Sequence, residues 1–423
     1  MKLVVDTPVQ FAVQLLSKWL TLCDICDLEE ALCSVENRLR LGTLYESVVL
    51  DCNSFVGNAE NLQLQLDWLV VRRIRVSSLR VEYPLSRVSL PKITALLKHS
   101  STSLQVLNLN DNDAALSTIV AAVSRFCTEL RVLEVASMAL CAPFFAMLGS
   151  LRSLHTFQVF HCERLNVEHL NDVLCPSIKS LTLAGDYSVK IQKELLKMCS
   201  HLETYHFCIH GYAEMQDMPA TLVSMIADNC RAVYIVNLNA NLKRVMITNN
   251  GIDDDSIAGM FTSCLHVQEL ILLSTDFLSD VTAKKIGDTY GHSLTMLNLY
   301  EWSSLSNSVM KYVCEKCLVL DTLVLGGQGF RFKPALVVIA LDNCPSLRTL
   351  QLMCDTVPDE VLRRIATAPL ETLDLTMVST LTDTGIMILV NGCAALKKIK
   401  MGNKTLSPLV KMMWRKVRPD LEF

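Results

Sequence analysis

The sequence predicts an α/β fold, a right-handed solenoid in which a parallel sheet forms the inner wall and helices cover the outside. Three observations support this prediction. An L-x-x-L-x-L pattern recurs every 23–28 residues, segments of helical period separate its copies, and cysteines precede many copies at one fixed distance. We expect about 12–13 repeats over 76–423, a small α-helical segment over 1–50, and a linker or first-repeat cap over 51–75.

The repeated pattern is an apolar alternation in which Val, Ile, Met, Phe or Tyr can replace Leu, as in SLQVLNL and ALKKIKM. Ten of the eleven steps between the main copies lie between 23 and 27 residues, and an earlier copy at Val76 precedes them by 28. This period is typical of leucine-rich repeats. The copies begin at Leu104, Leu130, Leu154, Ile178, Leu202, Leu242, Val267, Leu294, Leu320, Leu347, Leu370 and Leu396.

One step is longer, the 40 residues from Leu202 to Leu242. The string CRAVYIVNL also fits the pattern, with Val233 as its first apolar position. We prefer the register of Leu242, because it restores a regular step of 25 residues to Val267. The segment at about 211–240 is therefore predicted to be an insertion.

Between the copies the period becomes helical. LTDTGIMILVNGC places Ile386 and Leu389 on one helix face, with Thr382 or Asp383 able to cap the first turn. A single strand and helix cannot bury their apolar faces alone, so neighbouring units must stack. This accounts for an apolar fraction of 51% and a mean hydropathy of +0.32.

Charge and hydropathy exclude several classes of partner. Thirty-nine basic and 43 acidic side chains give a net charge of −4, too weak a field to favour nucleic acid or an anionic membrane. Apolar runs are far shorter than the ~18 residues that span a bilayer. The first residues, MKLVVDTPVQ, do not make a secretory signal. We expect a protein of the cytoplasm and/or nucleus that binds neither nucleic acid nor membrane.

Seventeen cysteines in a reducing compartment do not predict disulfides, and their number is odd. Cys230 stands three residues before the competing Val233, and seven others stand three residues before a copy of the pattern. A reduced cysteine behaves as a small, readily buried hydrophobe, so we predict a packing role at the end of each helix. The seven are Cys127, Cys175, Cys199, Cys264, Cys317, Cys344 and Cys393.

Two CxxC pairs, Cys23/Cys26 and Cys314/Cys317, compete as zinc or redox motifs. A structural zinc site needs four ligands, and nearly the whole array separates the two pairs. A redox motif needs a thioredoxin-like βαβ unit, which a repeat helix does not supply. We therefore expect neither metal nor redox chemistry at these cysteines.

No catalytic motif is recognisable. The sequence lacks GxxxxGK[ST], HExxH and GxSxG, and the glycine-rich string at 325–329 lacks the lysine of a phosphate loop. His155, His161 and His169 fall on different parts of one repeat, and the aspartates at 253–255 stand where a helix begins, so capping explains them. We expect a non-catalytic protein without cofactor or metal.

The repeats resemble a known family. LTDTGIMILVNGCAALKKIKM and DNCPSLRTLQLMC are similar to the cysteine-containing subclass of leucine-rich repeats, whose unit reads LTDxGhxxLxxxCxxLxxLxL. The resemblance covers about 76–423. It implies a repeat solenoid that recognises other proteins.

The N-terminal segment has two interpretations. It can be a plain helical cap that shields the open end of the solenoid. It also resembles an F-box, although Gln10 replaces the usual acid and no tryptophan follows Cys33. The residues that carry this resemblance are Pro8, Leu15, Leu16, Leu20, Asp24 and Ile25.

F-box/leucine-rich-repeat proteins imply a specific function. By this resemblance the chain would be the substrate receptor of a Skp-cullin-F-box type ubiquitin ligase, and a cullin-RING ligase adaptor would be one of its protein partners. The adaptor would contact Pro8, Leu15, Leu16, Leu20 and Ile25. The alternative is a stand-alone scaffold or regulatory protein with no ligase.

A binding site is expected on the inner wall, at the positions that the repeat leaves free. Because strand side chains alternate, the residue between the last two apolar positions points away from the core. Met246, Ile271 and Val324 make this column apolar at its centre. Alternatively, the insertion at 211–240 folds over these residues and merely buries them. Our candidate contacts are His206, Met246, Ile271, Tyr300, Trp302 and Val324.

Overall fold

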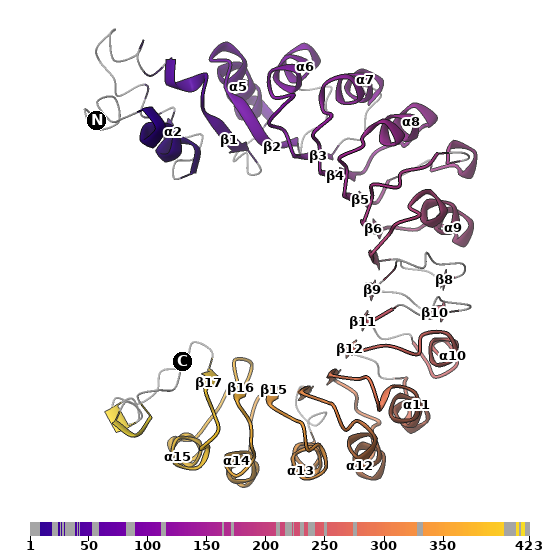
Figure 1. Ribbon diagram of the computed structural model, residues 1–423, viewed down its shortest axis with the longest axis vertical. Coiled ribbons are helices and arrows are strands. Elements are labelled where there is room, and N and C mark those ends of the chain that lie inside the picture. The colour runs from indigo at the N-terminus through magenta and orange to yellow at the C-terminus, as the bar shows by residue number, and fades with distance from the viewer. Residues whose placement is uncertain are drawn as a thin grey trace. The chain divides into compact units, whose positions relative to one another are not determined.

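The computed structural model divides the chain into two compact units, Met1–Leu202 and Glu203–Phe423, and each is described here by itself (Figure 1). The structure describes residues 9–18, 24–25, 27, 29, 39, 41, 43–52, 59–81, 89–110, 116–162, 165–170, 173–208, 212–215, 222, 224–228, 232–235, 242–248, 252–273, 277–327, 333–401, 412–413 and 416–418.

In the first unit, strands and helices alternate along the chain, and the strands pair in parallel with their sequence neighbours. The strands are β1 (Val49–Cys52), β2 (Arg75–Val81), β3 (Val106–Asn110), β4 (Val132–Ala136), β5 (Thr156–Phe160) and β6 (Ser180–Ala184). The helices are α2 (Val9–Lys18), α5 (Ala59–Val71), α6 (Leu90–His99), α7 (Leu116–Phe126), α8 (Ala142–Ser150), the 3₁₀ turn η2 (Val167–His169) and α9 (Val189–Met198).

The second unit repeats this arrangement. Its main sheet has the order β7-β9-β11-β12-β13-β14-β15-β16-β17, and β8 and β10 form a separate pair. The strands are β7 (Thr204–Cys208), β8 (Tyr212–Met215), β9 (Ser224–Asp228), β10 (Ala232–Ile235), β11 (Arg244–Thr248), β12 (Glu269–Leu273), β13 (Met296–Tyr300), β14 (Thr322–Gly326), β15 (Thr349–Met353), β16 (Thr372–Asp374) and β17 (Lys398–Lys400). The helices are α10 (Met260–Ser263), α11 (Asp280–Tyr290), α12 (Asn307–Lys316), α13 (Pro334–Asn343), α14 (Asp359–Ala366) and α15 (Asp383–Gly392).

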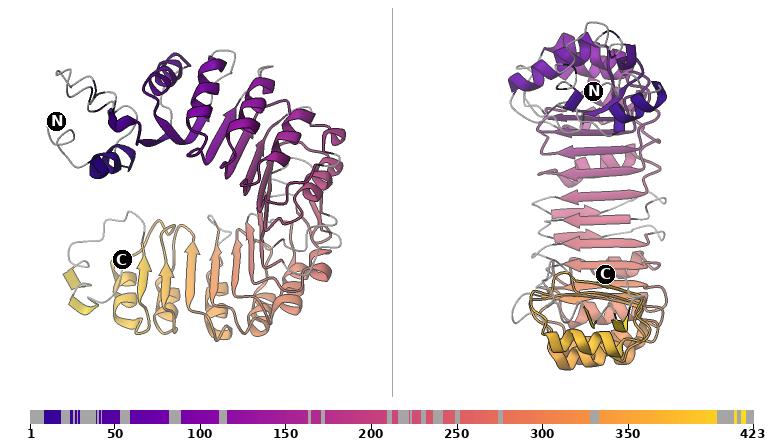
Figure 2. Two further views of the ribbon diagram at one scale, coloured as in Figure 1. Left: turned by 45° about the horizontal axis from the view of Figure 1, so that its top comes forward. Right: turned by 90° about the vertical axis from the view of Figure 1, so that its left-hand side faces the viewer.

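The core lies between the strand layer and the helix layer of each unit (Figure 2). All twelve first positions of the L-x-x-L-x-L pattern are buried, none exposing more than 2% of its surface. Each buried leucine contributes about 1.5–3 kcal/mol relative to an exposed one. The periodic leucines therefore account for the stacking, and the predicted α/β solenoid is confirmed.

The segment at 211–240 differs from the prediction. Strand β9 pairs in register with β7 on one side and β11 on the other, so it belongs to the main sheet. Leu222 and Met225 fill the apolar positions and are buried. The expected insertion is wrong, because the 40-residue step consists of two 20-residue repeats. The competing register at Val233 falls on β10, outside the main sheet.

The repeat array also begins earlier than residue 76. Strand β1 pairs in parallel with β2, although its sequence lies across the expected boundary at 50/51. Within the expected linker, Leu66, Leu69 and Ile74 are fully buried. Residues 49–75 thus supply a strand and a helix that cover the first predicted strand.

The cysteines have the predicted packing role. All seven that precede a copy of the pattern are buried, and five of them are the C-terminal caps of α9, α10, α12, α13 and α15. Cys314 is also fully buried, which leaves the Cys314/Cys317 pair no surface for redox exchange. Cys23, Cys26 and Cys230 lie outside the described residues.

We expect these thiols to be chemically inert in the folded protein. Burial raises the pKa of Cys127, Cys264 and Cys317 to about 12, so almost no thiolate forms at neutral pH. The half-exposed Cys141 and Cys208 should react first with iodoacetamide at pH 7.5. Peptide mass spectrometry measures the order, and the same labelling in urea is the control. Equal rates at Cys264 and Cys141 would contradict this account.

Aspartates link the helix starts of consecutive repeats in the second unit. Asp254 Oδ1 accepts a hydrogen bond from the backbone N–H of Ser279, the N-cap of α11, at 2.9 Å. Asp280 Oδ1 accepts one from Ser306, the N-cap of α12, also at 2.9 Å. Each carboxylate therefore satisfies a donor at the start of the next helix.

This link predicts a pH-dependent stability. Burial raises the pKa of Asp254, but the hydrogen bonds from Ser279 and Thr282 outweigh it, and the pKa lies below 3.8. A depressed pKa stabilises the fold above the unfolded value of about 3.9 and ceases to do so as the pH falls through the folded value. Asp254→Asn should cost about 1–2 kcal/mol at pH 7. Urea unfolding should show this gap closing below about pH 4.

The control for this prediction is Asp255→Asn, because Asp255 is exposed in the same acidic run. It should leave stability unchanged at both pH values. If Asp254→Asn and Asp255→Asn unfold at the same urea concentration at pH 7, the linking role of Asp254 is wrong.

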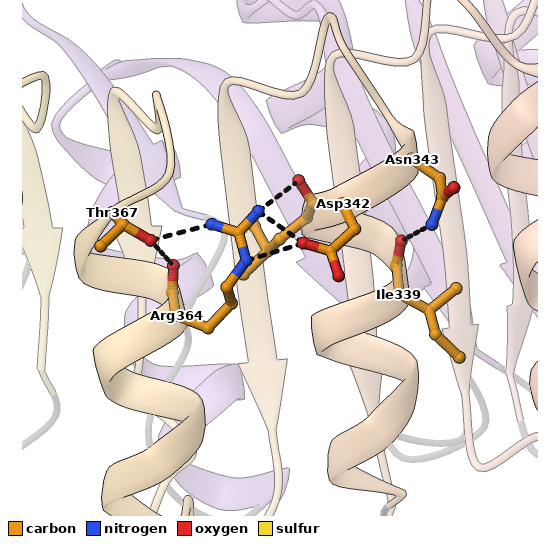
Figure 3. A network of polar contacts seen from close by, with 6 residues as sticks. Ile339, Asp342, Asn343, Arg364 and Thr367 are labelled. Carbon is orange, nitrogen blue, oxygen red and sulfur yellow. Dashed lines mark hydrogen bonds and ion pairs between the residues drawn. The ribbon is translucent and has the colours of Figure 1, made fainter.

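A second inter-repeat link lies on the helix layer (Figure 3). Arg364 of α14 reaches Asp342 of α13 through Nε at 2.7 Å and Nη2 at 2.6 Å, a bidentate ion pair. Its Nη1 also donates to Thr367 Oγ1 at 2.9 Å. This fork fixes the spacing of two neighbouring helices.

Candidate functional site

The inner face of the second unit is built from strand residues that alternate with the buried leucines. The register places Met246 beside Ile271, Ile271 beside Asn298, and Asn298 beside Val324. On the other side Met246 and His206 both flank position 226 of β9. The predicted middle column therefore exists as one continuous row across neighbouring strands.

Members of this row differ in accessibility. Ile271 and Val324 expose only 7% and 2% of their surfaces, so they form the floor of the wall. Met246, His206 and Tyr300 are half-buried and remain accessible from the inner side. A partner would thus contact the second group directly.

Trp302 was expected among the contacts and is buried, at 3% exposure. Its Nε1–H donates to the backbone carbonyl of Leu278 at 2.9 Å and to Ser304 Oγ at the same distance. The preceding Glu301 has φ +61, which turns the chain back toward the helix layer directly after β13. The expected partner contact is wrong for Trp302, which instead ties its turn to the preceding repeat.

Sequence reasoning missed three apolar side chains of the same face. Leu273, Met296 and Met353 are half-buried and lie two residues from a middle-column position. Strand alternation puts such residues on the same side as the middle column. Extending the column by two residues in each direction would have found them.

The inner side becomes charged toward the last strands. Glu371 pairs with Lys397 at 2.7 Å and with Arg348 at 3.8 Å, and Asp374 pairs with Lys400 at 3.4 Å. Burial raises the pKa of Asp374, but hydrogen bonds from Thr376 and Lys400 lower it further, and the net direction is downward. Asp374 is therefore ionised at neutral pH and holds its neighbour in place.

Comparisons with known proteins agree with this architecture only at the level of the fold. No protein-family model matches the sequence, and no curated protein matches it. The yeast Rad7 structure, solved in complex with Elc1, has 15% identity, covers 83% of this chain and 87% of its own, and gives a TM-score of 0.41. TLR13 in complex with ssRNA13 has 12% identity, 78% and 52% coverage, and a TM-score of 0.41. The chain is a leucine-rich-repeat solenoid.

The N-terminal segment packs against this leucine-rich-repeat solenoid. Ala12 and Leu16 of α2 are fully buried, and so is Ile25. Leu16 and Ile25 are thus covered within the chain, which contradicts their expected contact with an adaptor. Pro8 and Leu20 lie outside the described residues, as does the side chain of Leu15.

Glu29 connects this segment to the first helix of the array. Its carboxylate accepts hydrogen bonds from Trp68 Nε1 and Arg72 Nε, both at 2.9 Å, and from Tyr45 Oη at 3.3 Å. Burial raises the pKa of Glu29, but Arg72 and the other donors lower it further. This arrangement is what a docked cap requires.

The leucine-rich-repeat solenoid was also searched for chemistry. Among its described residues there is no group of three His, Cys, Asp or Glu side chains placed to hold a metal ion. In the same part of the chain, no helix has both the length and the apolar character needed to cross a membrane. The side chains of the inner face are therefore described here as a binding surface.

Proposed function

We propose that this solenoid is a non-catalytic recognition protein that binds a protein partner on the inner face of its second unit. The observation that carries the proposal is the set of half-buried apolar side chains on that face, Met246, Leu273, Met296, Tyr300 and Met353. They project from one continuous sheet and lie beside charged residues. Apolar anchors bordered by charge are typical of protein-binding surfaces.

The test compares a variant of the inner face with one of the helix layer. Met246→Glu combined with Tyr300→Glu should abolish capture of partners that the wild type binds, as measured by quantitative affinity purification. Lys284→Glu, on the exposed side of α11, changes the net charge by the same amount and should capture them unchanged. An identical set of partners for all three proteins would refute the inner-face site.

The docked N-terminal segment favours a stand-alone scaffold or regulatory protein over a ligase subunit. Burial of Leu16 and Ile25, together with the hydrogen bonds to Glu29, supports a cap that closes the first unit. The substrate receptor of a Skp-cullin-F-box type ligase is the second candidate. It is supported by the order Pro8, Leu15, Leu16, Leu20 and by a helix that starts at Val9, directly after the proline.

Binding to a purified Skp-type adaptor separates the two candidates. A stand-alone protein should show no complex by calorimetry at about 10 µM, whereas an affinity of 1 µM or better would correspond to about −8 kcal/mol. The ligase candidate also requires that Leu15→Glu abolish that complex. A complex that survives Leu15→Glu would mean that the adaptor binds elsewhere and that the F-box assignment fails.

A further inference from the structure

The turns that lead from each helix into the next strand form a continuous row along the second unit. Backbone hydrogen bonds hold consecutive turns together, since Asp321 donates to Thr295 and Arg348 donates to Asp321, both at 2.9 Å. The side chain of Ser346 also reaches the carbonyl of Leu318 at 2.7 Å. We define the turn row as the two residues after the cysteine position in six turns, at 265–266, 292–293, 318–319, 345–346, 368–369 and 394–395.

The turn row is apolar and exposed. None of its twelve residues is Asp, Glu, Lys or Arg, in a chain where these residues make up 19%. Leu318, Leu265 and Val319 expose 59%, 46% and 43% of their surfaces. Pro345 and Ala394 are exposed as well. Contiguous exposure of large apolar side chains marks an interaction surface.

The repeat itself does not require this composition. The equivalent turns of the first unit are Thr102–Ser103, Thr128–Glu129, Arg152–Ser153, Pro176–Ser177 and Ser200–His201. They contain an acid and a base, and none of these residues is an exposed large hydrophobe. The apolar turn row is therefore a property of the second unit and calls for an occupant.

The charges beside the turn row identify that occupant. Two positions after each pair stand, in order along the unit, Gln268, Thr295, Asp321, Arg348, Glu371 and Lys397. If a second copy of the chain met this row about a twofold axis lying across it, the order would be reversed in the second copy. Asp321 would then face Arg348 of the second copy, and Glu371 and Lys397 would face the uncharged Thr295 and Gln268.

We infer that the second unit forms a symmetric homodimer through the turn row. A twofold interface must be self-complementary, and this surface pairs apolar with apolar and acid with base. Leu318 and Val319 lie in the third of six turns, near the centre of the contact, where buried anchors contribute most. An acidic or basic partner would find no matching field here, because the row is uncharged and its border carries two acids and two bases.

Sedimentation equilibrium of the full chain at about 1–100 µM tests this inference. The wild type should show a reversible dimer, and Leu318→Glu should raise its dissociation constant by at least about tenfold. Leu174→Glu, 67% exposed in the first unit, is the matched control and should leave the dimer unchanged. Circular dichroism confirms that each variant is folded.

A charge exchange distinguishes pairing from a structural effect. Asp321→Arg should weaken the dimer, because it would face Arg348 of the second copy, and adding Arg348→Asp should restore it. A wild type that stays monomeric at 100 µM, or a dimer that Leu318→Glu leaves unaltered, would overturn the inference. Neither outcome bears on the inner face, so the proposed function is tested separately.

Discussion

Gly326→Ala is expected to destabilise the second unit by about 2–4 kcal/mol, because overpacking against backbone cannot relax. A Cβ at Gly326 would lie 2.1 Å from the carbonyl oxygen of Met353 and 2.6 Å from its carbon. Strands β14 and β15 would have to separate. That movement would break the hydrogen bond from Gly327 N–H to the same Met353 oxygen, which is 2.8 Å long.

Hydrogen exchange measures this effect locally, which suits a repeat protein whose unfolding need not be two-state. Amides of β14 and β15 should exchange about 30-fold to 1,000-fold faster in Gly326→Ala. Gly149→Ala is the control. The added Cβ meets nothing closer than 3.7 Å in α8, and alanine should stabilise that helix by about 0.5–1 kcal/mol. Unchanged exchange in β14 and β15 would show that the close approach to Met353 is not limiting.

Glu29→Ala is expected to release the N-terminal segment from the first helix of the array. The substitution removes the acceptor of Trp68, Tyr45 and Arg72 together and leaves their donors without it. We expect a loss of about 1–3 kcal/mol; a larger value is not expected, because the Arg72 side chain is 38% exposed and water screens the ion pair.

Limited proteolysis measures this release through cleavage within residues 1–48. Asp27→Ala is the matched control, since Asp27 is an exposed acid two residues earlier in the chain. It should be as resistant as the wild type. If Glu29→Ala is cleaved no faster than Asp27→Ala, the hydrogen bonds to Glu29 do not hold the segment.

The sequence was informative wherever one residue type had one structural reason. Leucine every 23–27 residues predicted the sheet, and cysteine three residues earlier predicted the helix ends, because burial dictates both. The pattern failed at β9, where Met225 is the central apolar residue and the repeat shortens to 20 residues. Backbone pairing with β7 and β11, which leaves no trace in side-chain type, decided that strand.

The candidate site was predicted only in part, for a related reason. Alternation correctly assigns Met246 and Tyr300 to the inner side, but it carries no information on how closely neighbouring strands crowd a side chain. Ile271 and Val324 have the same pattern position as Met246 and are nearly covered. Trp302 stands past the strand end, where alternation no longer applies and a hydrogen bond to Leu278 determines its direction.

Strands β8 and β10 have a geometric consequence for the wall in front of them. Adjacent strands lie about 4.8 Å apart, whereas packed helices need about 8–10 Å, so a helix layer behind a sheet forces the sheet to bend inward. Between β7 and β11 the outer layer consists of β8 and β10, and both layers then have the same spacing. Bending is relieved at this point, which helps to keep His206 and Met246 accessible while Ile271 and Val324, in front of helices, are squeezed by their neighbours. The shortened repeats thus make a locally flat stretch of wall on which a partner surface of low relief can lie.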